Sequence, residues 1–218
     1  ADSAPEIESL CSGLDCSRAG ALIPDLPPAK ALGTWAAAIR ETFEEVGILL
    51  AINGSGSPVS FSRPEDRARF QRYRKEISKG NLLLRRMLEQ EGLRLAADRL
   101  FYFSHWITPE ALPLRYDVRF FVTRAPECQE ALHDGYELTD HTWVAPREAL
   151  KAYRIGEMAL VLPTISTLME LCAFDSIDKV VESTTGKKIP AILTTMEVRD
   201  GSYVEVLPDG TVFGPSPV

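Results

Sequence analysis

Three glutamates stand close together in the segment IRETFEEVGILL, residues 39–50. In a helix, the spacing of Glu41, Glu44 and Glu45 places them on one face. Carboxylates crowded near a helix C-terminus repel one another and face the negative end of the helix dipole, which costs up to ~1 kcal/mol each when they are exposed. A divalent cation would turn this repulsion into binding, because Mg²⁺ prefers oxygen ligands. The spacing leaves a merely solvated helix end open as the alternative.

The surrounding residues predict the helix that would carry these side chains. Apolar Trp35, Ile39 and Phe43 recur every four residues, as they do on one face of a helix. Gly47 follows, and glycine readily adopts the left-handed backbone that ends a helix. We therefore expect a helix from about residue 29 or 30 up to residue 50.

The rest of the chain combines helical and strand patterns. Residues 64–97 predict a helical block that is broken at Gly80, and shorter helices are expected over residues 6–14, 146–153, 163–172 and 176–183. Aromatic and β-branched residues predict strands over residues 100–103, 115–122 and 137–144. Asp200-Gly201 predicts a hairpin turn between residues 192–198 and 202–207.

Composition and charge exclude several classes of protein. The 218 residues are 45% hydrophobic and 25% charged, which suits a globular chain with a sizeable core. A net charge of −7 argues against a nucleic acid polymer or a membrane surface as partner. The chain has neither a signal peptide nor an apolar run of ~20 residues, so we expect a cytoplasmic protein without a membrane span. The four cysteines do not form paired zinc motifs and are expected to be reduced thiols.

Residues 40–48, RETFEEVGI, resemble the second half of the Nudix box, REUxEExGU, in which U is a bulky apolar residue. The one deviation is Thr42, which stands at an apolar position of the motif. The resemblance implies that Glu41, Glu44 and Glu45 bind Mg²⁺ or Mn²⁺, and that these ions polarise a diphosphate and activate water. It also implies that Arg40 pairs with a carboxylate of the same helix.

The first half of the box is not found at its usual spacing, because Leu26 and Leu32 stand where a glycine and a glutamate belong. The region after the box nevertheless resembles the Nudix branch of the peroxisomal coenzyme A diphosphatase and its bacterial relatives, whose box carries an insertion. This resemblance extends over residues 34–171 and is strongest within residues 103–150. The shared residues are Trp106-Ile107-Thr108-Pro109, Arg115-Tyr116-Asp117, Phe120-Phe121, Asp134, Glu137, Trp143 and Pro146-Arg147-Glu148-Ala149-Leu150.

The resemblance implies an α/β fold of the Nudix type, an α/β/α sandwich with a mixed sheet and additional helices. We expect a single domain over residues 1–218, with the strands that normally precede the box absent from the start of the chain. The expected parts are an insertion within the box (1–29), the catalytic helix (30–50), a helical insertion (64–97), the core (98–175) and a C-terminal extension (176–218).

A fourth acidic residue, Glu137, is expected by resemblance to be a further metal ligand or the general base, with Asp134 and Asp140 as the next choices. Glu41 is the other candidate for the base. The alternative for Glu137 is an ordinary loop carboxylate in an acidic protein.

Three cationic or titratable side chains are candidates for substrate binding. Arg115 and Arg119 share one face of an expected strand and could hold phosphates, or they could form the polar face of a half-buried strand. His105 could contact a base or a phosphate, or it could be a hydrogen-bonded histidine near the surface.

The sequence thus predicts a Nudix diphosphate hydrolase, a metal-dependent pyrophosphatase that acts on a nucleoside diphosphate linked to another group. The branch resemblance suggests coenzyme A or acyl-CoA as the small-molecule substrate, and a homodimer is left open. The alternatives are a Nudix-like nucleotide-binding module that has lost catalysis, and an unrelated helical protein with a solvated acidic helix end.

Overall fold

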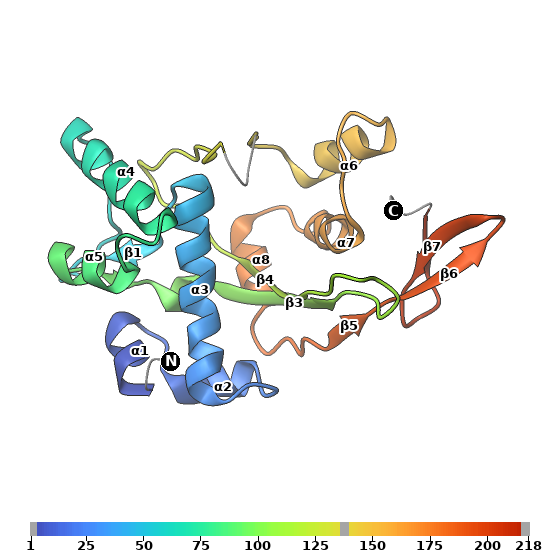
Figure 1. Cartoon of the computed structure of the whole chain (residues 1–218), viewed down its shortest axis with the longest axis horizontal. Coiled ribbons are helices and arrows are strands. Elements are labelled where there is room, and N and C mark those ends of the chain that lie inside the picture. The colour runs from blue at the N-terminus through green and yellow to red at the C-terminus, as the bar shows by residue number, and fades with distance from the viewer. Residues whose placement is uncertain (1–3, 136–139, 215–218) are drawn as a thin grey trace. The chain divides into compact units, whose positions relative to one another are not determined.

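The structure, a computed structural model, describes residues 4–135 and 140–214 (Figure 1). The chain divides into two compact units, which are described separately. Unit 1 comprises Ala1–Leu100 and Thr123–Thr142, and unit 2 comprises Phe101–Val122 and Trp143–Val218. The single domain expected over residues 1–218, and its division into an insertion, a catalytic helix, a helical insertion, a core and a C-terminal extension, remain predictions.

Unit 1 is mainly helical and is built around one long helix. Its elements are α1 (Ala4–Leu10), α2 (Cys16–Leu22), α3 (Pro28–Val46), β1 (Ala51–Ile52), α4 (Pro64–Ser78), α5 (Leu84–Glu91), β2 (Arg94–Leu95) and the 3₁₀ helix η1 (Ala97–Arg99). Helix α3 packs against α1 and α2 and also against α4 (Figure 1). Strands β1 and β2 pair antiparallel.

Helix α3 confirms the predicted apolar face. Trp35, Ile39 and Phe43 are buried, and the indole Nε1 of Trp35 donates to the carbonyl oxygen of Leu100 at 2.8 Å. The helix ends at Val46 rather than at residue 50, because Gly47 adopts a φ of 75° and its N–H donates to the carbonyl oxygen of Phe43. The predicted stop signal is therefore confirmed, whereas the predicted last residue is wrong.

The N-terminal segment differs from the single helix expected over residues 6–14. Helix α1 ends at Leu10, because the next residues leave the helix and pair with β2: the N–H of Ser12 donates to the carbonyl oxygen of Leu95 at 2.8 Å. A second helix, α2, then begins after Asp15, whose side chain accepts from the N–H of Arg18. Such an N-cap satisfies a backbone donor that would otherwise lack a partner.

The helical block predicted after residue 64 is confirmed, as is its break. Gly80 has a φ of 72° between α4 and α5. Phe70 and Ile77 of α4 and Met87 and Leu88 of α5 are buried in unit 1. The final residues of the expected block are not α-helical, because they form strand β2 and the start of the 3₁₀ helix η1.

Unit 2 contains a mixed sheet in the order β4-β3-β5. Strand β3 pairs antiparallel with β4 and parallel with β5, for example through His105 opposite Arg119 on one side and Ala191 on the other. The elements are β3 (Phe101–Ile107), β4 (Asp117–Val122), α6 (Pro146–Arg154), α7 (Leu162–Leu171), α8 (Ile177–Ser183), β5 (Ala191–Leu193), β6 (Thr195–Arg199), β7 (Ser202–Val206) and β8 (Val212–Phe213). The mixed sheet and the helices agree with the expected α/β fold class.

The predicted hairpin is confirmed in unit 2, although its first strand begins at Thr195 rather than at residue 192, because residues 191–193 form β5 of the other sheet. Strands β6 and β7 pair antiparallel, and the turn between them places Asp200 at a φ of 51° and Gly201 at 77°. Two successive positive φ values are what a tight hairpin turn of matching twist requires. The helices predicted over residues 146–153, 163–172 and 176–183 correspond to α6, α7 and α8.

The prediction of a strand over residues 137–144 is wrong for residues 140–144, the part that the structure describes. Residues 140–144 form no strand, and residues 137–139 lie outside the described residues. Asp140 accepts a hydrogen bond from the N–H of His141 at 2.7 Å, a local contact that competes with strand pairing. Trp143 has 72% of its surface exposed, so no neighbouring strand covers it.

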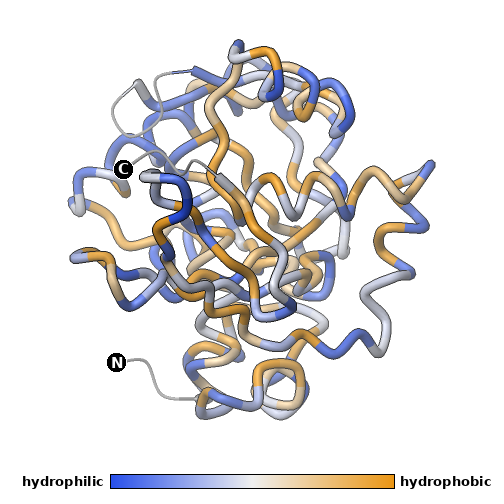
Figure 2. Tube along the Cα trace, turned by 90° about the vertical axis from the view of Figure 1, so that its right-hand side faces the viewer, coloured by the Kyte–Doolittle hydropathy of each residue, from blue (hydrophilic) through white to orange (hydrophobic). Residues whose placement is uncertain are grey.

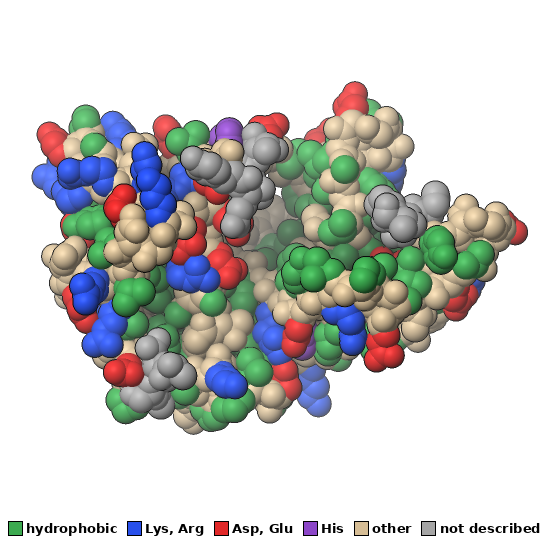
Figure 3. Space-filling model, viewed as in Figure 1, with side chains coloured by type: hydrophobic (Ala, Val, Ile, Leu, Met, Phe, Trp, Pro, Cys, Tyr) green, Lys and Arg blue, Asp and Glu red, His purple; other side chains and the backbone are tan. Residues whose placement is uncertain are grey.

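Polar and apolar residues are mixed along the part of the trace that the structure describes. Figure 2 shows hydrophobic and hydrophilic residues alternating over short distances. Within the described residues, 4–135 and 140–214, no helix is both long enough and apolar enough to cross a bilayer. On the face seen in Figure 3, acidic and basic side chains of unit 1 are interspersed.

Candidate active site

The packing of α3 determines where its three glutamates point. Because the face that carries Trp35, Ile39 and Phe43 is buried, Glu41 and the neighbouring acids of the last turns lie away from the core of unit 1. The side chain of Glu41 is 56% exposed and that of Glu44 is 19% exposed. The carboxylates are therefore held on a fixed helix face that a small ligand can reach.

Arg40 bridges two of these carboxylates. Its Nη1 lies 2.9 Å from Oε1 of Glu44, and its Nη2 lies 3.0 Å from Oε1 of Glu41. The expected pairing of Arg40 with a carboxylate of its own helix is confirmed. The guanidinium reduces the repulsion between acids one turn apart and fixes the direction of both side chains.

A second arginine, from α4, binds the C-terminal end of α3. Arg74 donates from Nε to the carbonyl oxygen of Glu44 at 2.9 Å and from Nη2 to that of Glu45 at 2.7 Å. These carbonyls belong to the last turn, which lacks helical partners and carries the negative end of the dipole. Burial lowers the pKa of the Arg74 guanidinium below its ordinary value, and the charge of Asp134 opposes this shift.

The segment that precedes Glu137 is attached to the same helix end. The side-chain amide of Gln129 accepts from the N–H of Leu49 and donates to the carbonyl oxygens of Leu49 and Val59. The N–H of Leu132 donates to the carbonyl oxygen of Val46 at 2.9 Å. Glu137 itself lies outside the described residues, so its predicted role stays a prediction.

A cavity adjoins this helix end within unit 1. It has a volume of about 520 Å³ and is lined by residues of α3, α4 and the segment 128–132. Arg67, Arg74 and Glu130 contribute charged groups, and Phe43 and Phe70 contribute apolar surface. The walls of this cavity are therefore mixed in polarity.

The substrate-binding candidates of unit 2 have partners of their own. His105, which is 4% exposed, is hydrogen-bonded through Nε2 to Oδ1 of Asp117, and Nη1 of Arg119 lies 3.0 Å from the same oxygen. Burial by itself raises the pKa of the Asp117 carboxyl, but the bonds and charges of these neighbours outweigh it, so that the pKa lies below its ordinary value. Arg115 donates from Nε to the carbonyl oxygen of Thr108 at 3.3 Å. The predicted contacts of all three with substrate stay predictions.

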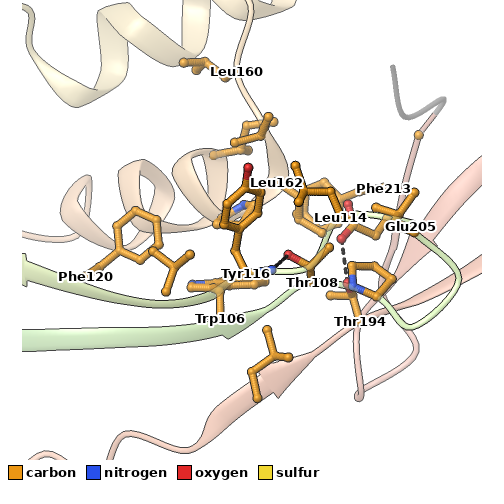
Figure 4. Close-up of a pocket in the computed structure, with 18 of the residues that line it drawn as sticks. Trp106, Thr108, Leu114, Tyr116, Phe120, Leu160, Leu162, Thr194, Glu205 and Phe213 are labelled. Carbon is orange, nitrogen blue, oxygen red and sulfur yellow. Dashed lines mark hydrogen bonds between the residues drawn. The ribbon is translucent and has the colours of Figure 1, made fainter. Parts of the chain in front are cut away.

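Unit 2 holds a pocket that sequence reasoning missed. Its volume is about 580 Å³, and Figure 4 shows the side chains of Trp106, Tyr116 and Phe120 lying along it with Leu162 of α7. A polar pair lies at one end, where the hydroxyl of Thr194 donates to Oε1 of Glu205 (Figure 4). The indole N–H of the buried Trp106 finds no acceptor among the described residues. The pocket's largely apolar walls can therefore take an apolar group.

Comparison with known proteins shows which family the chain belongs to. Residues 22–171 match the model of the NUDT19 Nudix domain. The chain belongs to this Nudix family. The match includes α3 with its three glutamates, and it includes β3, β4, α6 and α7.

Two curated Nudix proteins are similar to the chain in sequence, in agreement with the family match. The chain is 26% identical over 200 residues to the acyl-coenzyme A diphosphatase NUDT19 of Gallus gallus, and this alignment covers 83% of this chain and 52% of the relative. It is 26% identical over 221 residues to the protein of the same name from Xenopus laevis, covering 93% of this chain and 55% of the relative. The chain therefore spans about half the length of these curated relatives.

A solved structure supports the Nudix fold. A Nudix hydrolase from Alicyclobacillus acidocaldarius shares 29% identity and a TM-score of 0.58 with the chain, and the match covers 72% of this chain and 66% of that one. The mixed sheet and the α/β class expected from the sequence are confirmed by this likeness.

The Nudix glutamates fit a hard divalent cation through their chemistry. All three offer oxygen donors on adjacent turns of a fixed helix face, which Mg²⁺ and Mn²⁺ prefer. Within the described residues, they do not gather their ligand atoms into a ready three-ligand cluster. Since Mg²⁺ usually takes one or two protein carboxylates and completes its shell with substrate phosphates, such a cluster is not required.

Proposed function

We propose that this chain is a metal-dependent Nudix hydrolase that cleaves the diphosphate bond of a nucleoside diphosphate linked to another group. The observation that carries the proposal is the face of α3 on which Arg40 bridges Glu41 and Glu44. The match of residues 22–171 to a Nudix domain supports the proposal, as does the resemblance of residues 40–48 to the second half of the Nudix box.

Glu41, Glu44 and Glu45 would hold Mg²⁺ or Mn²⁺ in this proposal. The bound ion supplies positive charge that polarises the diphosphate and makes water easier to deprotonate. Glu41 or Glu137 would take the proton from the attacking water. The water oxygen then bonds to one phosphorus and the bond from that phosphorus to the bridging oxygen breaks, so that the nucleoside and the other group leave with one phosphate of the former diphosphate each.

Coenzyme A and acyl-CoA are the proposed substrates, with acyl-CoA preferred. The names of the two vertebrate relatives support this choice.

A direct assay tests the proposal. The purified protein is incubated with coenzyme A, acyl-CoA, ADP-ribose, NADH and dinucleoside polyphosphates, with Mg²⁺ or Mn²⁺ present. We expect cleavage of coenzyme A or acyl-CoA, and a loss of at least about 100-fold in kcat for Glu44→Gln and Glu45→Gln, as is common when a main electrostatic contribution is removed. Glu65→Gln, a change at an exposed residue of α4, is the matched control. The proposal fails if no compound is cleaved, or if both variants cleave as fast as the parent protein.

A nucleotide-binding module without catalysis is the second candidate. The observation that favours it is Leu32, which stands where the first half of the box would place a glutamate and is completely buried in α3. Calorimetry with coenzyme A and ADP-ribose separates the two. Binding without cleavage supports the module, whereas cleavage that depends on Glu44 excludes it.

A further inference from the structure

Two histidines and an aspartate meet in unit 1, outside the glutamate cluster of α3. Nδ1 of His133 lies 2.8 Å from Nδ1 of His141. One ring nitrogen of each histidine and one carboxylate oxygen of Asp140 all lie within 4.8 Å of one another. Among the residues that the structure describes, these three form the one group of histidine, cysteine or acidic side chains with ligand atoms this close together.

The chemistry of the three donors indicates which ion they would take. Two imidazole nitrogens and a carboxylate suit Zn²⁺ and its first-row neighbours, whereas Mg²⁺ prefers oxygen ligands. We propose that His133, Asp140 and His141 form a binding site for Zn²⁺ or a similar transition-metal ion, with a water molecule as the fourth ligand. The site is distinct in ligand type from the glutamates of α3.

The geometry lies close to what such an ion needs. Two nitrogens that each lie about 2.0–2.1 Å from a tetrahedral Zn²⁺ are about 3.3 Å apart. The two Nδ1 atoms are 2.8 Å apart, so a small separation of the rings would admit the ion. The ring centroids are 5.0 Å apart and the ring planes are tilted by 46° to one another, so the rings are not stacked face to face.

The same contact can exist without an ion, as a hydrogen bond in which one ring carries a proton on Nδ1 and the other accepts it. Binding Zn²⁺ requires lone pairs on both nitrogens, so this proton moves to the other nitrogen of its ring or is released. Asp140 is already oriented, because its Oδ1 accepts from the N–H of His141 at 2.7 Å. A hydrogen-bonded histidine pair and a metal site therefore differ in a measurable property, the affinity for a transition-metal ion.

The site begins next to a fixed point of unit 1. His133 directly follows Leu132, whose N–H is bonded to the carbonyl oxygen of Val46 at the end of α3. An ion that joins His133 to Asp140 and His141 would close a short loop of the chain, and a short loop is inexpensive in entropy to close. The proposal does not depend on the hydrolase function, because it concerns metal binding alone.

Titration calorimetry with ZnCl₂ on the full chain tests the proposal. Cys128→Ser serves as the parent protein, since Cys128 is an exposed thiol that could bind Zn²⁺ by itself. We expect one Zn²⁺ per chain, and a Kd raised at least about tenfold by His133→Gln or by His141→Gln. The chain has three histidines, so His105→Gln is the matched control and should leave the Kd unchanged. Excess Mg²⁺ should not displace the Zn²⁺.

Co²⁺ provides a second measurement that does not depend on folding energetics. Tetrahedral coordination by nitrogen and oxygen gives Co²⁺ a visible d–d absorption, which both histidine variants should lose while retaining the circular dichroism of the parent. Glu44→Gln should keep the absorption, even if it abolishes hydrolysis. Equal Zn²⁺ affinity in the parent and in the folded histidine variants, or displacement of Zn²⁺ by Mg²⁺, would overturn the proposal.

Discussion

Nε of Arg74 lies 2.9 Å from the carbonyl oxygen of Glu44, across 30 residues of sequence. This bond joins α4 to the last turn of the helix that carries the glutamate cluster. It places a partly buried cation at the negative end of the helix dipole. The end of the helix that carries the glutamates is therefore held by a residue outside the Nudix box.

Replacing Arg74 should destabilise unit 1. Arg74→Met keeps much of the apolar stem but removes both bonds to the helix end, so we expect the free energy of unfolding to fall by about 2 kcal/mol. Urea denaturation measures the loss. Arg72→Met, on the exposed side of α4, should change the free energy by less than about 0.5 kcal/mol. Equal effects of the two changes would show that the bonds to Glu44 and Glu45 contribute nothing.

Two glycines of the α3 region should respond in opposite directions to alanine. Gly33 lies within the helix, and the space that a Cβ would occupy there is open, so Gly33→Ala should stabilise the protein by up to about 1 kcal/mol. Gly47 has a φ of 75°, and a Cβ there would lie 3.0 Å from Nη1 of Arg74. Gly47→Ala should therefore destabilise by at least about 1 kcal/mol. Thermal unfolding of both variants checks the signs, and a stabilising Gly47→Ala would contradict the described helix end.

The cysteines should differ strongly in reactivity. Burial raises the pKa of the Cys11 thiol to about 12, and burial together with Glu8 raises that of Cys16 to about 11, so both are protonated at pH 8. The thiolate is the reactive form, and Cys128 is exposed. In native protein a thiol reagent should modify Cys128 first and should reach Cys11 and Cys16 only after unfolding. Cys128→Ser should remove the fast phase, and rapid modification of the buried pair in native protein would contradict this order.

Asp117 should make stability sensitive to acid. Its pKa is lower in the folded state than in the unfolded state, because His105 and Arg119 outweigh the effect of burial. Ionised Asp117 therefore stabilises the fold at any pH above 3.8, the ordinary pKa of the unfolded state. This contribution to stability is lost as the pH falls through the lower pKa of the folded state. Asp117→Asn should lower the free energy of unfolding at pH 7 and narrow the gap to the parent near pH 3. Urea titrations at both pH values measure the gap, with Glu157→Gln as the exposed control. A constant gap would rule out the titration of Asp117 as the cause.

The sequence by itself determined the features that depend on neighbours along the chain. The repeat of Trp35, Ile39 and Phe43 predicted the buried face of α3, and Gly47 predicted its end, because helix geometry relates residues three and four apart. Asp200-Gly201 predicted the hairpin for a similar reason. Local signals were less certain where a side chain competed with the backbone, as at Asp140, where a strand was expected and none formed.

Only the tertiary structure decided which distant residues meet. Arg74 carries no sequence mark that connects it to Glu44, and Thr194 and Glu205 join Trp106 in one pocket although they follow it by some 90 residues or more. His133 and His141 also became neighbours only through the path of the chain between them. Such contacts follow from how whole elements pack, and packing depends on the summed burial of many side chains rather than on the spacing of a few.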